Sequence, residues 1–159
     1  MSKIAQYLNE HILGEVTTDA AVRKAFSTDA SVLTLTPEMV TYPRVTNDIR
    51  KIARFSWQLA EKGHVLPITA RGGGSDQTGG AIGKGMIVNT TAHMNTIFEL
   101  DAKQKLVRLQ PGVTYKTLND ALALQGLQLP SYPASASYST IGGGIANNAS
   151  GVLSGKYGS

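Results

Sequence analysis

Residues 71–83 read Arg71-Gly72-Gly73-Gly74-Ser75-Asp76-Gln77-Thr78-Gly79-Gly80-Ala81-Ile82-Gly83. Six of these thirteen residues are glycine, which adopts positive φ readily and has no Cβ to hold a ligand away from the backbone. Successive backbone N–H groups in such a loop can converge on an anion. One or two glycines are enough for a turn or bulge, so this number favours a phosphate-binding loop.

The segments on either side of this loop indicate its architecture. Residues 64–70 and 86–91 are both apolar and extended in pattern, and no helix cap follows the glycines. A Rossmann or Walker phosphate loop needs a helix directly after its glycines. The chain has no G-x-G-x-x-G, and Gly85 stands where a Walker loop requires Ser or Thr. The sequence therefore predicts a phosphate cradle between two strands.

A second glycine cluster lies within residues 133–151, which read PASASYSTIGGGIANNASG. Ser139 or Thr140 can cap a short helix there, and the positive end of that helix would point at the ligand of the first loop. A hairpin and a helix separate the two clusters. This arrangement suggests one ligand that is held from two sides.

Together these segments resemble the FAD-binding domain of the vanillyl-alcohol oxidase and p-cresol methylhydroxylase flavoproteins, most of all its D-lactate and glycolate dehydrogenase branch. The loop resembles the family pattern R-G-G-G-T-S-x-x-G, and the second segment resembles P-A-S-x-x-x-x-T-I-G-G-x-x-A-x-N-A-x-G. Residues 26–31, 110–113 and 156–158 also resemble the family. The likeness runs from about Arg23 to the last residue.

The resemblance implies FAD as cofactor and a set of residues that bind it. The expected cofactor-binding residues are Arg71, Gly72, Gly73, Gly74, Ser75, Asp76, Gln77, Gly79, Pro133, Ala134, Ser139, Thr140, Gly142, Gly143, Asn148 and Gly151. Some relatives tether the flavin through a histidine of the loop. Ser75 stands at that position here, so we expect FAD to be bound non-covalently.

Several of these residues have two interpretations. Arg71 either neutralises the charge of the ligand or braces the loop through backbone carbonyls. Asn148 either contacts the ligand or only ends the short helix. Asp76, where the family often has an uncharged residue, would repel a diphosphate unless it points away, and we expect it to cap a local turn. Gly144 and Ser150 also depart from residues that the family often shows.

Composition excludes several other classes of protein and site. The chain has no cysteine, so disulfides, thiolate metal sites and a cysteinyl flavin bond are excluded within it. Its net charge of +4 comes from dispersed residues without a basic run, which argues against nucleic acid. His11, His64 and His93 lack metal-ligand spacing, so no metal site is expected. No apolar run has the length of a signal peptide or a membrane span, so we expect a cytoplasmic protein.

The elements predict an α+β fold in which helices flank a small mixed sheet. Residues 1–30 are expected to form a helical lead-in, with Asp19 capping its second helix. Residues 31–159 are expected to form a single unit, the first FAD-binding subdomain, with the second subdomain and the substrate domain absent. Extended segments are expected at residues 32–36, 39–42, 86–91, 97–100, 105–110 and 127–129. Helices are expected from a cap at Asn47 to Gly63 and from Thr114 to Gln125, with Trp57 against the sheet edge.

The predicted function is that of an N-terminal FAD-binding fragment of a flavin-dependent oxidoreductase. The family branch implies a small 2-hydroxy acid such as D-lactate or glycolate as substrate of the full-length parent. No catalytic residue is assigned, and the fragment alone is expected to be inactive and able to self-associate. The alternatives are a reductase similar to enolpyruvyl-UDP-muramate reductase and a nucleotide-binding module without catalysis.

Overall fold

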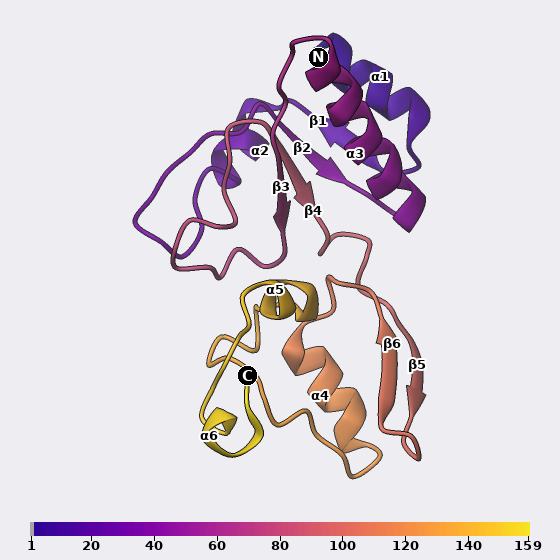
Figure 1. The fold of residues 1–159 in the computed structure, drawn as a ribbon, viewed down its shortest axis with the longest axis vertical. Coiled ribbons are helices and arrows are strands. Elements are labelled where there is room, and N and C mark those ends of the chain that lie inside the picture. The colour runs from indigo at the N-terminus through magenta and orange to yellow at the C-terminus, as the bar shows by residue number, and fades with distance from the viewer. Residues whose placement is uncertain (1) are drawn as a thin grey trace.

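The computed structural model describes residues 2–159, which form two lobes (Figure 1). In chain order the elements are α1 (Lys3–His11), β1 (Glu15–Thr17), α2 (Ala20–Ala25), β2 (Met39–Tyr42), α3 (Thr46–Glu61), β3 (Ile68–Arg71), β4 (Met86–Asn89), β5 (Ile97–Asp101), β6 (Leu106–Leu109), α4 (Tyr115–Ala123), α5 (Ile141–Ala146) and α6 (Ser154–Tyr157). The first lobe contains α1 to β4, and the second contains β5 to α6. The predicted α+β class with a mixed sheet is confirmed.

The first lobe is built on a four-stranded sheet with the order β1-β2-β4-β3. Strands β2, β4 and β3 run parallel, and β1 pairs antiparallel with β2. Parallel strands need a crossover connection, and α3 provides it between β2 and β3. The loop of residues 72–85 then returns the chain to β4, beside β3, without a helix. The predicted arrangement of strand, glycine loop and strand is therefore confirmed.

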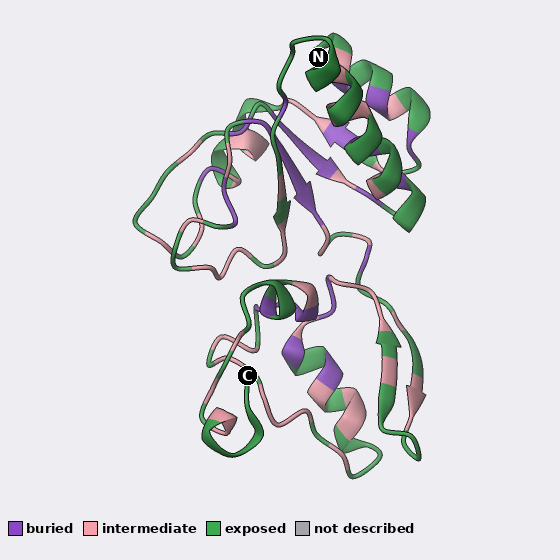
Figure 2. Ribbon diagram, viewed as in Figure 1, coloured by how far each residue is buried: buried purple, intermediate pink, exposed green. Residues whose placement is uncertain are grey.

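The core of this lobe lies between the sheet and the helices α1 and α3. Leu8 of α1, Ile52 of α3 and Met86 of β4 are all buried in it. Burial follows the central strands, and all four residues of β4 are buried (Figure 2). On the opposite face Val40 and Ile87 are buried under α2 and the end of the glycine loop. The loop is thus fixed at its far end by the sheet itself.

The N-terminal lead-in belongs to this core. Leu8 and Ala5 are almost inaccessible to solvent, and β1 extends the sheet through its pairing with β2. Asp19 caps α2 as predicted, because its Oδ1 atom accepts the backbone N–H groups of Ala21 and Val22. The division of the chain at residue 30 stays a prediction. The structure, however, packs both sides of that division around one core.

The second lobe has a separate core. Strands β5 and β6 pair only with each other, and α4 and α5 pack beside them. Val113, Tyr115, Leu118 and Ile141 form the buried centre. The predicted single unit over residues 31–159 stays a prediction. The elements of that range contribute to two core clusters, which apolar periodicity alone does not reveal.

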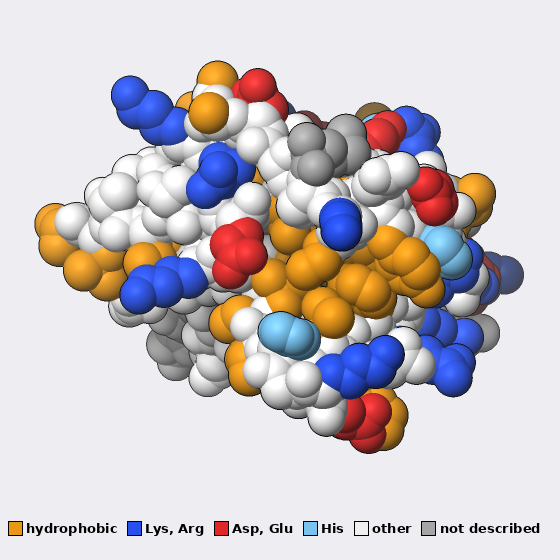
Figure 3. Space-filling view, turned by 90° about the horizontal axis from the view of Figure 1, so that it is seen from above, with side chains coloured by type: hydrophobic (Ala, Val, Ile, Leu, Met, Phe, Trp, Pro, Cys, Tyr) orange, Lys and Arg blue, Asp and Glu red, His pale blue; other side chains and the backbone are white. Residues whose placement is uncertain are grey.

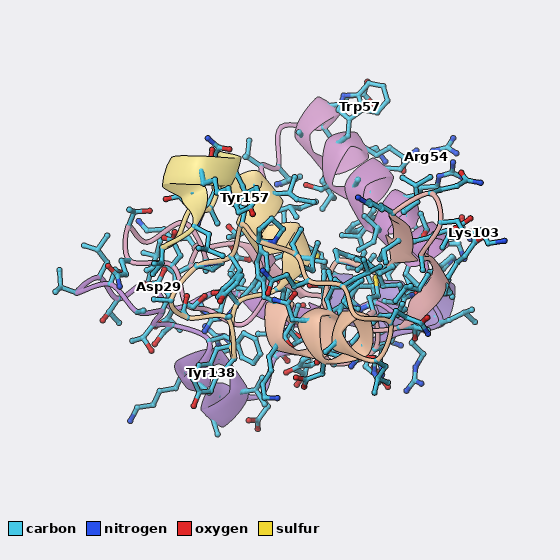
Figure 4. All side chains as sticks on the ribbon, turned by 90° about the horizontal axis from the view of Figure 1, so that it is seen from below. Asp29, Arg54, Trp57, Lys103, Tyr138 and Tyr157 are labelled. Atoms are coloured by element: carbon cyan, nitrogen blue, oxygen red, sulfur yellow. The ribbon has the colours of Figure 1, made fainter. Side chains whose placement is uncertain are left out.

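Some of the predicted elements differ from the structure. Residues 32–36 and 127–129 are not strands, although Thr34 forms an isolated bridge with Thr28. The N-cap of α3 is Val45, so the predicted cap at Asn47 is wrong. Trp57 is 65% exposed and points away from the sheet (Figure 4), so its predicted place at the sheet edge is also wrong. No helix of residues 2–159 combines the length and the apolarity that crossing a membrane requires.

Exposed apolar groups remain on both lobes. Tyr7 is 45% exposed and stacks on Phe55 and His11 at ring-centroid distances of 5.0 and 4.0 Å. Figure 3, which views the molecule from the end of the first lobe, shows apolar side chains gathered among Lys and Arg side chains. Strand β3 is an edge of the larger sheet, and edge strands can pair with other chains. The predicted self-association stays a prediction.

The carboxylate of Asp48 does the capping that the sequence assigns to Asn47. Asp48 is buried, and its oxygens accept backbone N–H groups from Leu13 at 2.9 Å, Gly14 at 3.1 Å, Arg44 at 2.9 Å and Val45 at 3.4 Å. It therefore joins the start of α3 to the turn before β1. This contact links residues far apart in the sequence, which explains why local patterns do not reveal it.

We expect Asp48→Ala to lower the free energy of unfolding by about 2–4 kcal/mol, because it leaves buried N–H donors without acceptors. Urea denaturation followed by circular dichroism measures the effect. Asp120→Ala is the matched control, because its ion pair with Lys116 is exposed and such pairs contribute roughly 0.5 kcal/mol or less. Equal losses of unfolding free energy in Asp48→Ala and Asp120→Ala would contradict the capping role of Asp48.

The same contact predicts a pH dependence. Burial alone would raise the pKa of Asp48, but the N–H bonds from Leu13, Arg44, Val45 and Gly14 outweigh it and hold the pKa below the usual 3.8. The stabilisation is therefore fully present above the unfolded-state pKa and is lost as pH falls through the lower folded-state value. The stability difference between wild type and Asp48→Asn should stay constant near neutral pH and shrink in acid.

Candidate functional site

The two glycine segments meet between the lobes. The loop after β3 lies at the lower end of the first lobe and faces α5 at the top of the second (Figure 1). Together they line a cavity of about 780 Å³. Its walls include residues 72–78 from the first segment and residues 133–135 and 139–140 from the second. The structure therefore brings the two segments together around one space, as the sequence predicts.

Two side-chain hydrogen bonds cross between the lobes at this cavity. The hydroxyls of Ser75 and Ser139 are 2.8 Å apart, and Ser139 is also 2.7 Å from the Ser135 hydroxyl. Asn147 Nδ2 donates to Asp76 Oδ1 at 2.8 Å. The Ser75–Ser139 and Asp76–Asn147 bonds join the glycine loop to the second segment. The loop is thus a shared wall of both lobes.

Close backbone contact between the segments explains the first glycines of the loop. A Cβ on Gly72 would overlap Thr140 Oγ1, and a Cβ on Gly73 would overlap the Tyr138 carbonyl oxygen. We expected the absent Cβ atoms to make room for a ligand. At Gly72 and Gly73 the absence of a Cβ allows the second lobe to pack against the loop. At Gly143, by contrast, an added Cβ meets only Thr140 Oγ1, at 3.2 Å.

The loop presents a run of unpaired backbone donors. Within residues 2–159, the N–H groups of Gly72, Gly73, Gly74, Ser75, Asp76 and Gln77 have no hydrogen-bond acceptor. All six residues line the cavity. Clustered backbone N–H groups of this kind bind anions through their partial positive charge. The cavity therefore has the donor set of an anion site on one wall.

The N-terminus of α5 also borders the cavity. Thr140 caps it as predicted, and the Gly143 N–H donates to Thr140 Oγ1 at 3.2 Å. The N–H groups of Ile141 and Gly142 donate to the carbonyls of Val113 and Pro111 at 2.8 and 3.0 Å. These first donors are therefore satisfied inside the protein. The expectation that this helix end is directed at the ligand stays a prediction: Thr140 and Gly143 line the cavity, but the N–H groups of Ile141 and Gly142 already have acceptors in the second lobe.

Arg71 braces the glycine loop. Its Nη1 atom donates to the carbonyls of Thr28 at 2.8 Å and Ala81 at 3.1 Å, and its guanidinium lies 5.1 Å from the centre of the Phe26 ring. Burial lowers the pKa of Arg71 below its ordinary value, while the nearby charge of Asp29 acts in the opposite direction. Arg71 is not part of the cavity lining. Of its two interpretations, the contacts support the structural one.

Asp76 folds the outer part of the loop around its carboxylate, as predicted. Its Oδ2 atom accepts Gly80 N–H at 2.7 Å, Thr78 N–H at 2.9 Å and the Thr78 hydroxyl at 2.8 Å. The Gly80 N–H bond and the Thr78 hydroxyl bond are the main reasons that the pKa of Asp76 falls to about 2. Asp76 is therefore ionised at neutral pH.

A family model described as an FAD binding domain matches residues 37–159. The chain belongs to the FAD-binding domain family of the vanillyl-alcohol oxidase and p-cresol methylhydroxylase flavoproteins. It is 37% identical over 145 residues to D-2-hydroxyglutarate dehydrogenase of Pantoea ananatis, a match that covers 91% of this chain and 14% of that protein. It is 36% identical over 123 residues to glycolate oxidase subunit GlcD of Bacillus subtilis, covering 77% of this chain and 25% of that protein.

A solved structure has the same fold. Alkyldihydroxyacetonephosphate synthase superposes with a TM-score of 0.82 over 99% of this chain and 32% of that chain, at 22% sequence identity. The resemblance inferred from the two glycine segments is thereby confirmed, and so is the fold class. The chain spans only about a seventh to a third of the proteins that it matches.

The structure places most of the predicted site residues of this FAD-binding domain at the cavity. Those that line it are Gly72, Gly73, Gly74, Ser75, Asp76, Gln77, Pro133, Ala134, Ser139, Thr140 and Gly143. Those outside the lining are Arg71, Gly79, Gly142, Asn148 and Gly151. Gly142 packs on Pro111, and Gly151 packs on the Tyr132 carbonyl. Asn148 lies instead at a second, mostly apolar cavity of about 710 Å³ between β6, α4 and α5.

Several residues of the lining are not among the predicted site residues. They are Ala70, Thr78, Gly80, Ala81, Ser135, Gly144, Ala146, Asn147, Ala149 and Ser150. Helical spacing could have found two of them, because Ala146 and Asn147 follow Gly143 by three and four residues and therefore share its side of the helix. None of the three histidines lines the cavity. Within residues 2–159, no group of His, Asp and Glu side chains could hold a metal ion.

The two kinds of glycine predict opposite effects on stability. Gly73→Ala should lower the free energy of unfolding by roughly 1–3 kcal/mol, because its Cβ overlaps the Tyr138 carbonyl and the lobes must separate. Gly143→Ala should leave stability unchanged or raise it by up to about 1 kcal/mol, because alanine favours a helix. Urea denaturation of both variants tests this. A larger loss in Gly143→Ala than in Gly73→Ala would contradict the packing described.

Proposed function

We propose that this chain binds FAD non-covalently, with the diphosphate of the cofactor on the backbone N–H groups of residues 72–77. The observation that carries the proposal is the run of six unpaired donors in the wall of the cavity. A diphosphate offers many acceptor oxygens in a compact group, which matches such a row of donors. The family match to an FAD binding domain supports the same ligand.

The residues present at the cavity fit this cofactor. Hydroxyls of Ser75, Ser139 and Thr140 stand at the wall beside the unpaired N–H groups and can turn their protons toward phosphate oxygens. Gly143 lines the cavity on the side of α5, and its lack of a Cβ lets a ligand approach the backbone there. Contact with both segments would hold the lobes together. The cofactor is therefore expected to stabilise the arrangement that binds it.

The chemistry of the lining supports non-covalent binding. In the described part of the chain the cavity wall holds no histidine, cysteine or tyrosine, which are the side chains that attach flavins covalently. Ser75 occupies the loop position at which some relatives carry histidine, and its hydroxyl is hydrogen-bonded to Ser139. Serine is not ionised at neutral pH and is a poor nucleophile without a base.

We further propose that the flavin serves a 2-hydroxy acid dehydrogenase. The names of D-2-hydroxyglutarate dehydrogenase and glycolate oxidase among the relatives support this substrate class. When bound, FAD would supply the redox chemistry. The one ionisable side chain in the described lining is Asp76, and a group with a pKa of about 2 is too acidic for a general base at neutral pH. The share of this chain is therefore to bind and orient the cofactor.

Purified chain 1–159 should bind FAD with a Kd above about 1 μM, because a flavin held mainly at its diphosphate gains little apolar burial. Flavin fluorescence titration measures the affinity. Gly143→Ala should weaken it about tenfold by placing a methyl group in the cavity wall, whereas Gly155→Ala, at an exposed glycine with no neighbour within 4 Å, should not. Unchanged affinity in Gly143→Ala, or flavin that stays with the polypeptide after acid precipitation, would contradict the proposal.

A full-length protein that contains this chain should reduce an artificial electron acceptor in the presence of a 2-hydroxy acid. D-2-hydroxyglutarate, D-lactate and glycolate are the substrates to compare, with the corresponding 2-oxo acids as controls because they cannot be oxidised in the same way. Dye reduction by the purified holoprotein gives the measurement. Flavin-loaded protein that reduces the dye with none of the three acids would overturn the substrate class and leave the FAD site intact.

A further inference from the structure

The cavity contains no cation of its own. Among its lining residues within the described chain, Asp76 is the one that ionises, and no lysine, arginine or histidine is present. The nearest arginine of the loop, Arg71, lies behind it and is bonded to the carbonyls of Thr28 and Ala81. Asp29 also interacts with both Arg71 and Asp76. The charges of Arg71, Asp29 and Asp76 therefore sum to one negative charge.

The carboxylate of Asp76 is fixed in place. Its two oxygens accept hydrogen bonds from Gly80, from Thr78 through both backbone and hydroxyl, and from Asn147 of the other lobe. A rotation of the carboxylate would break these bonds. Its pKa of about 2 keeps it charged at neutral pH. A ligand must therefore bind beside a permanent negative charge.

We propose that Asp76 makes this cavity selective for diphosphate diesters and against ligands that end in a free phosphate. The inference rests on the proposed FAD function and specifies which phosphate chemistry the site accepts. In a diphosphate diester such as a dinucleotide, each phosphate has one acidic proton to lose and carries one negative charge. A terminal phosphate carries roughly −1.5 to −2 at pH 7. The extra charge is repelled by Asp76, while the neutral N–H donors have no compensating charge to offer.

This arrangement differs from phosphate sites that use a lysine or arginine as a point charge. Backbone N–H groups attract an anion through short-range dipoles and require close contact. The carboxylate acts over a longer range and opposes every further negative charge. The balance therefore favours a ligand with little charge per phosphate, and it disfavours nucleoside diphosphates and triphosphates.

ADP-ribose and ADP test the proposal, because they share the adenosine diphosphate and differ in whether the outer phosphate is esterified. Their affinities for chain 1–159 can be measured by amide-shift titration at pH 7.5 without divalent cations. Wild type should bind ADP-ribose more tightly than ADP. The dissociation constant of ADP divided by that of ADP-ribose should be about three- to tenfold smaller in Asp76→Asn than in wild type. Asn147→Ala removes the bond between the lobes but keeps the charge, so it should retain the wild-type ratio.

Salt gives a second measurement that needs no variant. Raising ionic strength from roughly 0.02 M to 0.5 M screens the carboxylate, so the preference of wild type for ADP-ribose should shrink. If FAD binds but the ratio is the same in wild type and Asp76→Asn and does not respond to salt, the selectivity role is overturned and the FAD site stands. If neither FAD nor ADP-ribose binds, the proposed function fails, and this inference fails with it.

Discussion

The close backbone contact between the glycine loop and the second lobe is the constraint on which the site depends. Gly72 lies against the Thr140 side chain, and Gly73 lies against the Tyr138 carbonyl, at distances that exclude a Cβ. The two lobes have separate cores, so this contact, with the Ser75–Ser139 and Asp76–Asn147 hydrogen bonds, determines how they meet at the cavity. The cavity exists because two independently packed units share one loop as a wall.

The loop keeps its shape through the hydrogen bonds of two charged side chains, Arg71 and Asp76. The Arg71 guanidinium donates to the Ala81 carbonyl, and the Asp76 carboxylate accepts the N–H groups of Thr78 and Gly80. These two residues satisfy the polar groups at the ends of the loop and leave the donors of residues 72–77 unpaired at the cavity. The start of α5 does the opposite and uses its donors for packing. The unpaired donors at the cavity therefore lie mainly in the first segment.

Local chemistry made much of this predictable from the sequence. Asp19, Thr114 and Thr140 cap their helices as expected, because an N-cap depends on the next three residues. Two glycine clusters indicated the shared ligand site and the family. Long-range features were not predictable. Asp48 caps α3 and also accepts the N–H groups of residues 13 and 14, and Asn147 donates to Asp76 from the other lobe. Strand β4 lies between β2 and β3 in the sheet. No window of sequence contains those partners together.

The account predicts that a bound diphosphate takes up the unpaired donors of the loop. Amide hydrogen exchange of chain 1–159, measured with and without saturating FAD, tests this most directly, because an N–H group without an acceptor exchanges fast and slows when it becomes hydrogen-bonded. Exchange should slow at residues 72–77 and change little at the start of α5, where the donors are already bonded. Slowing that occurs at residues 141–143 while residues 72–77 still exchange fast would contradict it.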